Sequence, residues 1–204
     1  MFLLEEGRFP RYHDAPMMDV RNAPFVVIDV ETTGLDPEED RVCEVGAIRT
    51  VADREEGRFH SLVKPDRPVS DGARAKHGIT DDMLCDAPPF GAIAADLRKF
   101  LAGSILVAQN AEFDVSFLNA EFRRAGMAKL ALPAMDTIAL ARRVRPGLGA
   151  YNLDSLARHF GVRFSERHRS IGDCEVTVQV FWKCVEALHP PPRTIEELIR
   201  KGTR

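Results

Sequence analysis

The sequence predicts an α/β fold, a single domain in which a mixed five-stranded sheet has helices on both faces. Three strand patterns come first along the chain, and strands and helices alternate after them. The length of 204 residues corresponds to about one domain. With 45% hydrophobic and 29% charged residues, the composition is ordinary for a globular protein. No apolar run approaches the roughly 18 residues of a transmembrane helix, so we expect no membrane partner.

The expected elements follow in order. The run FVVIDVE at 25–31 is typical of a buried strand, and TTGLDP after it is typical of a turn. Further strands are expected at 42–51, 59–63, 104–108 and 130–135. Helices are expected just before His77-Gly78 and at 90–101, 111–125, 136–144, 152–160 and 171–188.

The sequence divides into three expected segments. They are a loose N-terminal extension at 1–24, the domain itself at 25–188, and a proline-rich tail at 189–204. Pro190 to Pro192 end the domain. Thr194 and Glu197 form a T-x-x-E capping box, which predicts a short helix. This helix either packs back on the core or docks to a partner.

Charge and cysteines limit the classes of function. The net charge of −3 argues against a non-specific nucleic-acid-binding coat. The stretch 158–169 is nevertheless net basic, which taken alone indicates a solvated face. The four cysteines form no CxxC pair and are expected to be reduced thiols. The start, MFLLEEGRF, has too short an apolar run for a secretory signal, so we expect a cytoplasmic protein.

Two carboxylates lie on the first strand. Asp29 and Glu31 are two residues apart, so their side chains share one face. Asp29 stands within VVIDVE, where a core strand favours valine, and burying a lone carboxylate costs roughly several kcal/mol. A surface pair or a salt bridge is the simpler explanation, and it suits Glu31 better than Asp29.

Two further aspartates begin helices. Asp114 shares a helix face with Phe117 and Leu118, although a first-turn aspartate is also favoured by the helix dipole. Asp173 forms an S-x-x-D capping pattern with Ser170, which by itself explains its presence. His168 precedes it by five residues in a loop, where a lone histidine is usually solvated.

Together these residues indicate a metal-dependent reaction. Carboxylate oxygens select hard cations such as Mg²⁺ or Mn²⁺, and four of them balance two divalent ions. Two such ions stabilise the attacking and leaving oxygens of a phosphoryl displacement. Histidine is the residue type suited to accept a proton from water near neutral pH. The combination predicts metal-assisted phosphodiester hydrolysis.

Three motifs in this order carry a resemblance to a known family. DVETTGL at 29–35, QNAEFD at 109–114 and HRSIGD at 168–173 resemble the exonuclease motifs of the DnaQ-like (DEDDh) 3′→5′ exonucleases. The likeness runs from about residue 25 to 188, and the segments at 59–69, 76–80, 135–137 and 151–162 are similar to its proofreading members. The resemblance implies a ribonuclease-H-like fold.

The resemblance also implies roles for individual residues. Asp29, Glu31, Asp114 and Asp173 would hold two divalent cations, Mg²⁺ or Mn²⁺, and His168 would be the general base. Thr32, Thr33 and Gly34 would present backbone and hydroxyl groups to the 3′-terminal nucleotide, Leu35 and Phe113 would pack on the last bases, and Asn110 and His77 would line the site. The stretch 158–169 would attract backbone phosphate. One departure is Gln109, where the family usually has histidine; we expect altered substrate positioning without loss of chemistry.

Several functions remain open on these residues. The leading one is release of 5′-mononucleotides from single-stranded or frayed DNA 3′ ends, in proofreading or repair. The second is RNA trimming, because only the 2′-hydroxyl separates the substrates. The third is an inactive, partner-binding module, which the complete acidic set argues against, and the fourth an unrelated carboxylate-metal endonuclease, which the spacing of His168 and Asp173 disfavours. The sequence leaves open whether a DNA polymerase subunit binds the chain.

Overall fold

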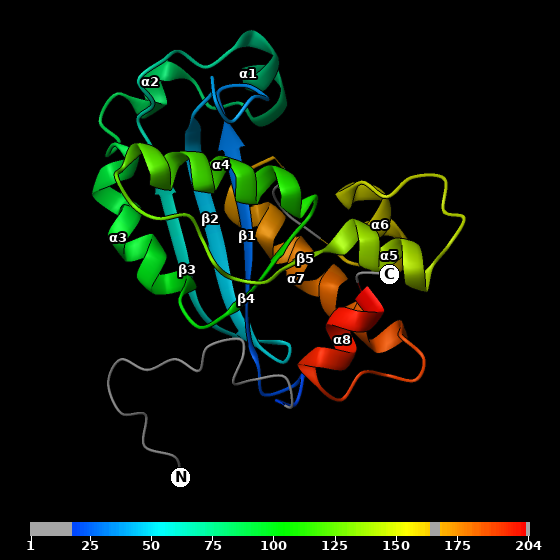
Figure 1. Ribbon diagram of the computed structural model, residues 1–204. Helices are drawn as coiled ribbons and strands as arrows, with labels where there is room; N and C mark the ends of the chain where they lie inside the picture. The colour runs from blue at the N-terminus through cyan, green and yellow to red at the C-terminus, as the bar shows by residue number, and fades with distance from the viewer. Residues whose placement is uncertain (1–17, 164–167, 203–204) are drawn as a thin grey trace.

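The computed structural model describes residues 18–163 and 168–202. Its centre is a five-stranded sheet in the order β3-β2-β1-β4-β5 (Figure 1). The strands are β1 (Pro24–Thr32), β2 (Val42–Val51), β3 (Arg54–Leu62), β4 (Ile105–Ala108) and β5 (Ala134–Asp136). The pairs β1–β2 and β2–β3 are antiparallel, whereas β1–β4 and β4–β5 are parallel. The predicted mixed sheet is confirmed.

Helices cover both faces of the sheet (Figure 1). They are α1 (Asp71–His77), α2 (Asp81–Leu84), α3 (Phe90–Leu101), α4 (Ala111–Arg124), α5 (Thr137–Val144), α6 (Leu153–Phe160), α7 (Ser170–Ala187) and α8 (Ile195–Gly202). Because side chains alternate along β1, Val26 and Ile28 pack against α3 and α4, whereas Phe25 and Val27 pack against the helices α5 to α8. None of the described helices is long and apolar enough to span a bilayer.

Three elements differ from the predicted ones. β3 begins at Arg54 rather than at residue 59, because its first residues are exposed and polar on an edge strand and give no apolar pattern. β5 spans 134–136 and so overlaps the strand predicted at 130–135 only at residues 134 and 135. Pro133, which has no N–H, precedes it and accepts the Leu106 N–H through its carbonyl. α2 was not predicted, since four residues are too few to show a helical period.

The two ends of the described chain pack together. Ile195 and Leu198 of α8 are buried in the core, so the C-terminal helix packs back on the domain. The Val20 N–H donates to the Arg193 carbonyl at 2.9 Å, and Val20 is itself buried. The expectation of a loose extension is therefore wrong for residues 18–24, because these bonds and contacts fix them. Residues 1–17 of that extension lie outside the described residues.

Candidate active site

Four carboxylates converge at the carboxyl end of β1. Oxygen atoms of Asp29, Glu31 and Asp173 lie within 4.8 Å of one another. Asp114, in the first turn of α4, accepts a 3.0 Å hydrogen bond from the Val30 N–H. All four line one pocket of about 280 Å³, together with Val30, Leu35, Lys76, Gln109, Asn110 and Phe113. The structure thus brings together the four acidic residues singled out from the sequence.

The crowding of these carboxylates makes their ionisation unfavourable. Burial, followed by repulsion from Asp173, raises the pKa of Glu31 to about 7. Burial raises the pKa of Asp114 to about 8, although the Val30 N–H opposes the shift. Burial and the three neighbouring carboxylates also raise the pKa of Asp29 well above its usual range. An oxygen-only donor set under such mutual repulsion fits hard divalent cations, which favour the ionised forms.

A glycine lets α7 approach the sheet closely enough to bring Asp173 into this group. A Cβ on Gly46 would lie 2.6 Å from the carbonyl carbon of Ser170 and 2.7 Å from the backbone nitrogen of Ile171. Gly46 of β2 stands opposite Asp29 in the strand register. Only a residue without a side chain therefore allows the first turn of α7 to rest at this position.

Glu44 is a buried carboxylate that the sequence predictions missed. It is 0% exposed, and its oxygens accept from Arg169 Nε at 3.0 Å, from the Ser170 N–H at 2.8 Å and from His60 Nε2 at 2.9 Å. Burial alone would raise the pKa of Glu44, but the hydrogen bonds from Arg169, His60 and Ser170 outweigh it and lower the pKa to about 2. The available signal was one acidic residue within the apolar strand VCEVGAI. Glu44 fixes the two residues that follow His168.

His168 lies five residues before Asp173 in the sequence, but its side chain does not line the acidic pocket. Its side chain is exposed, its φ is 60°, and its N–H donates to Asp173 Oδ1 at 3.2 Å. The segment 164–167 of the expected basic stretch lies outside the described residues. Arg169, at the end of this stretch, is paired with Glu44 and is one-third exposed, so the attraction of phosphate by the stretch stays a prediction.

The turn after β1 is held together by its own hydroxyl groups. Thr33 is 1% exposed, and its Oγ1 donates to Asp40 Oδ1 and accepts from the Arg41 N–H. The expected contact of the Thr33 hydroxyl with substrate is therefore contradicted, because that hydroxyl is buried within the turn. Thr32 Oγ1 likewise donates to the Gly34 carbonyl at 2.6 Å. Leu35 is 80% exposed and stands at the border of the pocket.

His77 is a buried, neutral residue that joins α1 to β1. Its Nδ1 accepts the Ile79 N–H at 3.1 Å, so Nε2 carries the proton and donates to the Thr32 carbonyl at 3.2 Å. Burial lowers the pKa of His77, which agrees with the neutral form. His77 is not among the residues that line the acidic pocket and instead positions α1 beside it, so the expected contact of His77 with substrate stays a prediction.

The segment between β4 and α4 forms another wall of the pocket. Gln109 Nε2 donates to the Tyr151 carbonyl at 2.7 Å, and its Oε1 accepts from the Thr137 hydroxyl. Gln109 therefore ties the end of β4 to α5 and to the segment before α6. Asn110 has a φ of 71° and leads into α4. Phe113 lines the pocket and packs on Phe117, with ring centroids 4.8 Å apart.

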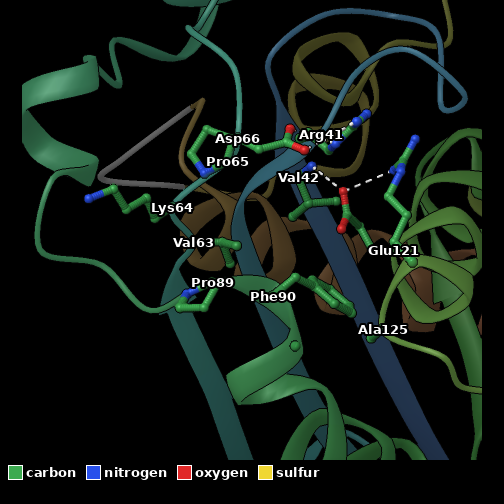
Figure 2. A pocket seen from close by; sticks show the side chains of 12 residues that line it. Arg41, Val42, Val63, Lys64, Pro65, Asp66, Pro89, Phe90, Glu121 and Ala125 are labelled. Carbon is green, nitrogen blue, oxygen red and sulfur yellow. Dashed lines mark hydrogen bonds and ion pairs between the residues drawn. The ribbon is translucent and has the colours of Figure 1, made fainter.

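A second pocket lies along the other half of α4 (Figure 2). The buried carboxylate of Glu121 accepts there from the Val42 N–H at 3.3 Å and from Arg124 at 3.1 Å. Among the described residues, this pocket shares no lining residue with the acidic one. Glu121 thus fixes α4, which carries Asp114, against the start of β2.

A mixed sheet with four converging carboxylates at the end of its central strand defines a class of metal-dependent nucleases. The family model for exonucleases of the RNase T type matches residues 26–181, and the chain belongs to this exonuclease family. The resemblance carried by the three motifs is thereby confirmed.

Relatives and solved structures agree with this assignment. The chain is 42% identical to DNA polymerase III subunit epsilon of Treponema pallidum, over 77% of this chain and 74% of that protein. It is 36% identical to the PolC-type DNA polymerase III of Oceanobacillus iheyensis, over 91% of this chain but only 13% of that longer protein. A structure of exonuclease X with 5′ overhanging duplex DNA matches with a TM-score of 0.67 and 27% identity, covering 87% of this chain and 99% of that one. Exonuclease I shares the fold, with a TM-score of 0.74 and 23% identity, covering 83% and 42% of the two chains.

Proposed function

We propose that the chain removes nucleotides one at a time from DNA 3′ ends and releases 5′-mononucleotides. The observation that carries this proposal is the convergence of Asp29, Glu31, Asp114 and Asp173 in one pocket of an exonuclease-family chain. DNA is the favoured substrate because relatives include a DNA polymerase subunit and a structural neighbour contains duplex DNA. A DNA polymerase subunit is accordingly a proposed partner.

The four carboxylates are the proposed ligands of two divalent cations, Mg²⁺ or Mn²⁺. When bound, these cations supply charge neutralisation at the phosphate and a more acidic attacking water. Binding of cations would be favourable here because the ionised carboxylates repel one another and are largely removed from solvent. An inactive module would retain this repulsion without relief, which argues against that alternative.

The remaining steps are assigned to side chains around the pocket. We assign His168 as the base that accepts a proton from the attacking water; its backbone is held beside Asp173 by the 3.2 Å hydrogen bond. Leu35 and Phe113 would pack against the terminal bases, a mode of binding that tolerates any sequence. The terminal nucleotide would be contacted by the backbone of Thr32 and Gly34 and by the side-chain amide of Asn110.

A labelled-substrate assay tests the proposed reaction. Purified protein is incubated with 5′-labelled single-stranded DNA, mismatched primer-template DNA or RNA, in Mg²⁺, Mn²⁺ or EDTA. We expect a ladder that shortens by one nucleotide from the 3′ end, requires metal and forms faster on DNA. Faster shortening of RNA would overturn the substrate assignment, and no cleavage in either metal would overturn the reaction.

A further inference from the structure

Lys76 lies in the acidic pocket and has no assigned role. It stands in the last turn of α1, which lies beyond the carboxyl end of β1 (Figure 1), and it lines the pocket with all four carboxylates. Among the described residues that line this pocket, it is the only one with a permanent positive charge. Its side chain is exposed to the pocket and to solvent. A cation is therefore present where a substrate phosphate must approach.

The ammonium group is close to the carboxylates without being paired to them. The positive charge of Lys76 lowers the pKa of both Asp29 and Glu31, against the larger effect of burial. In the described parts of the chain, no hydrogen bond or ion pair links the ammonium group of Lys76 to another residue. Its three N–H donors thus remain available to a ligand that enters the pocket.

The backbone that carries Lys76 is fixed. Ser70 caps the start of α1, where its side chain accepts the Ala73 N–H. Gly78 caps the end, with a φ of 72° and an N–H that donates to the Arg74 carbonyl. The neighbouring His77 donates to the Thr32 carbonyl at 3.2 Å. These bonds place the helix end at a constant position relative to β1, as a substrate-binding residue requires.

We propose that Lys76 binds a non-bridging phosphate oxygen at the 3′-terminal linkage of the nucleic-acid substrate and positions that linkage over the carboxylates. This inference rests on the proposed function. The charges favour this contact, because a phosphodiester adds one negative charge to a pocket in which Lys76 is the only positively charged side chain among the described lining residues. Arg169 also lies close in sequence to a pocket residue, Asp173, but its guanidinium is already bound to Glu44.

Single-turnover hydrolysis of a 5′-labelled single-stranded oligodeoxynucleotide, at increasing protein concentration and several salt concentrations, tests the role of Lys76. We expect Lys76→Met to raise the half-saturating protein concentration about 10-fold and to lower the slope of log affinity against log salt by roughly 0.7, the value for one phosphate contact on a single strand. Lys76→Arg should restore most of the affinity. The matched control is Lys99→Met, a change of an exposed lysine on α3 that lines no part of the acidic pocket in the described chain.

A different result would show that Lys76 only offsets the negative charge of the carboxylates and does not bind the substrate phosphate. In that case Lys76→Met would leave affinity and salt slope unchanged and would lower the Mg²⁺ concentration needed for half-maximal rate, which overturns the proposal. A wild-type chain that binds the oligonucleotide in fluorescence anisotropy but does not hydrolyse it would contradict the proposed function only, and the anisotropy of Lys76→Met would still decide the role of the lysine. Absence of binding by the wild type would overturn both.

Discussion

The guanidinium of Arg169 makes a two-point ion pair with the fully buried carboxylate of Glu44, with Nη2–Oε1 at 2.5 Å and Nε–Oε1 at 3.0 Å. The pair connects the middle of the sheet to the residue immediately before α7. His168 precedes this residue and Asp173 follows it by one helical turn. A carboxylate with no part in metal binding thus determines where two proposed active-site residues stand.

Glu44→Gln should destabilise the fold and slow the reaction. The amide keeps the shape of the side chain but removes the negative charge with which Arg169 pairs. Removing one partner of a buried pair costs roughly 3–5 kcal/mol, and we expect about 2–3 kcal/mol because the Arg169 side chain is one-third exposed. Urea unfolding in EDTA measures the change. Glu55→Gln, which breaks an exposed pair with Arg58, is the control and should cost less than about 1 kcal/mol; equal effects of the two variants would contradict the account.

Gly46→Ala should displace α7 from the sheet. The new Cβ would meet backbone atoms of Ser170 and Ile171 at 2.6–2.8 Å, and backbone cannot yield as a flexible side chain does. We expect a loss of about 1–3 kcal/mol in the free energy of unfolding and a rate lower by about 10²-fold, since a shift near 1 Å in a catalytic group has that effect. Gly57→Ala, in the neighbouring strand, meets only a Phe100 ring atom at 3.7 Å and serves as control. Near-wild-type hydrolysis by Gly46→Ala would refute the close-approach argument.

The metal-free protein should lose stability as pH rises. The pKa of Glu31, about 7, and that of Asp114, about 8, lie above the values of an unfolded chain. At these two residues the folded state therefore holds more protons than the unfolded state, so their contribution to stability is fully present below about pH 4 and is lost as pH rises towards about 8. Glu44, whose pKa is lowered to about 2, acts in the opposite direction, and its contribution is lost only as pH falls from about 4 towards 2. Thermal unfolding in EDTA across this range measures the effect, and saturating Mg²⁺ should reduce it.

Asp114→Asn separates this electrostatic effect from a general change in fold. The amide oxygen can still accept the Val30 N–H, but it carries no charge. We expect this variant to be more stable than the wild type in EDTA near pH 8, to show a weaker pH dependence and to bind Mg²⁺ less tightly. A variant that is less stable at every pH would show that the hydrogen bond, and not the repulsion, dominates at this residue.

The sequence predicted the sheet and the acidic group because both depend on local patterns. Residues 42–51 and 90–101 show their structure through apolar periodicity, and Asp29 stands out because valine and isoleucine flank it in the run VVIDV. The Glu44–Arg169 pair joins residues 125 positions apart, and no local pattern reports such a pairing. For the same reason the buried, neutral role of His77 and the buried hydroxyl of Thr33 became visible only with their partners. Lys76 carries no pattern of its own, since an exposed lysine at a helix end is common.

The most direct test of the central claim compares Asp29→Ala and His168→Ala with the wild type in single-turnover hydrolysis of 5′-labelled DNA with Mg²⁺. If the four carboxylates form the metal centre and His168 is the base, Asp29→Ala should be nearly inactive. His168→Ala should remain detectable at a rate lower by about 10²–10⁴-fold, the usual contribution of a general base. Wild-type turnover by Asp29→Ala would contradict the account, because no reaction that depends on this acidic pocket could survive the loss of its central carboxylate.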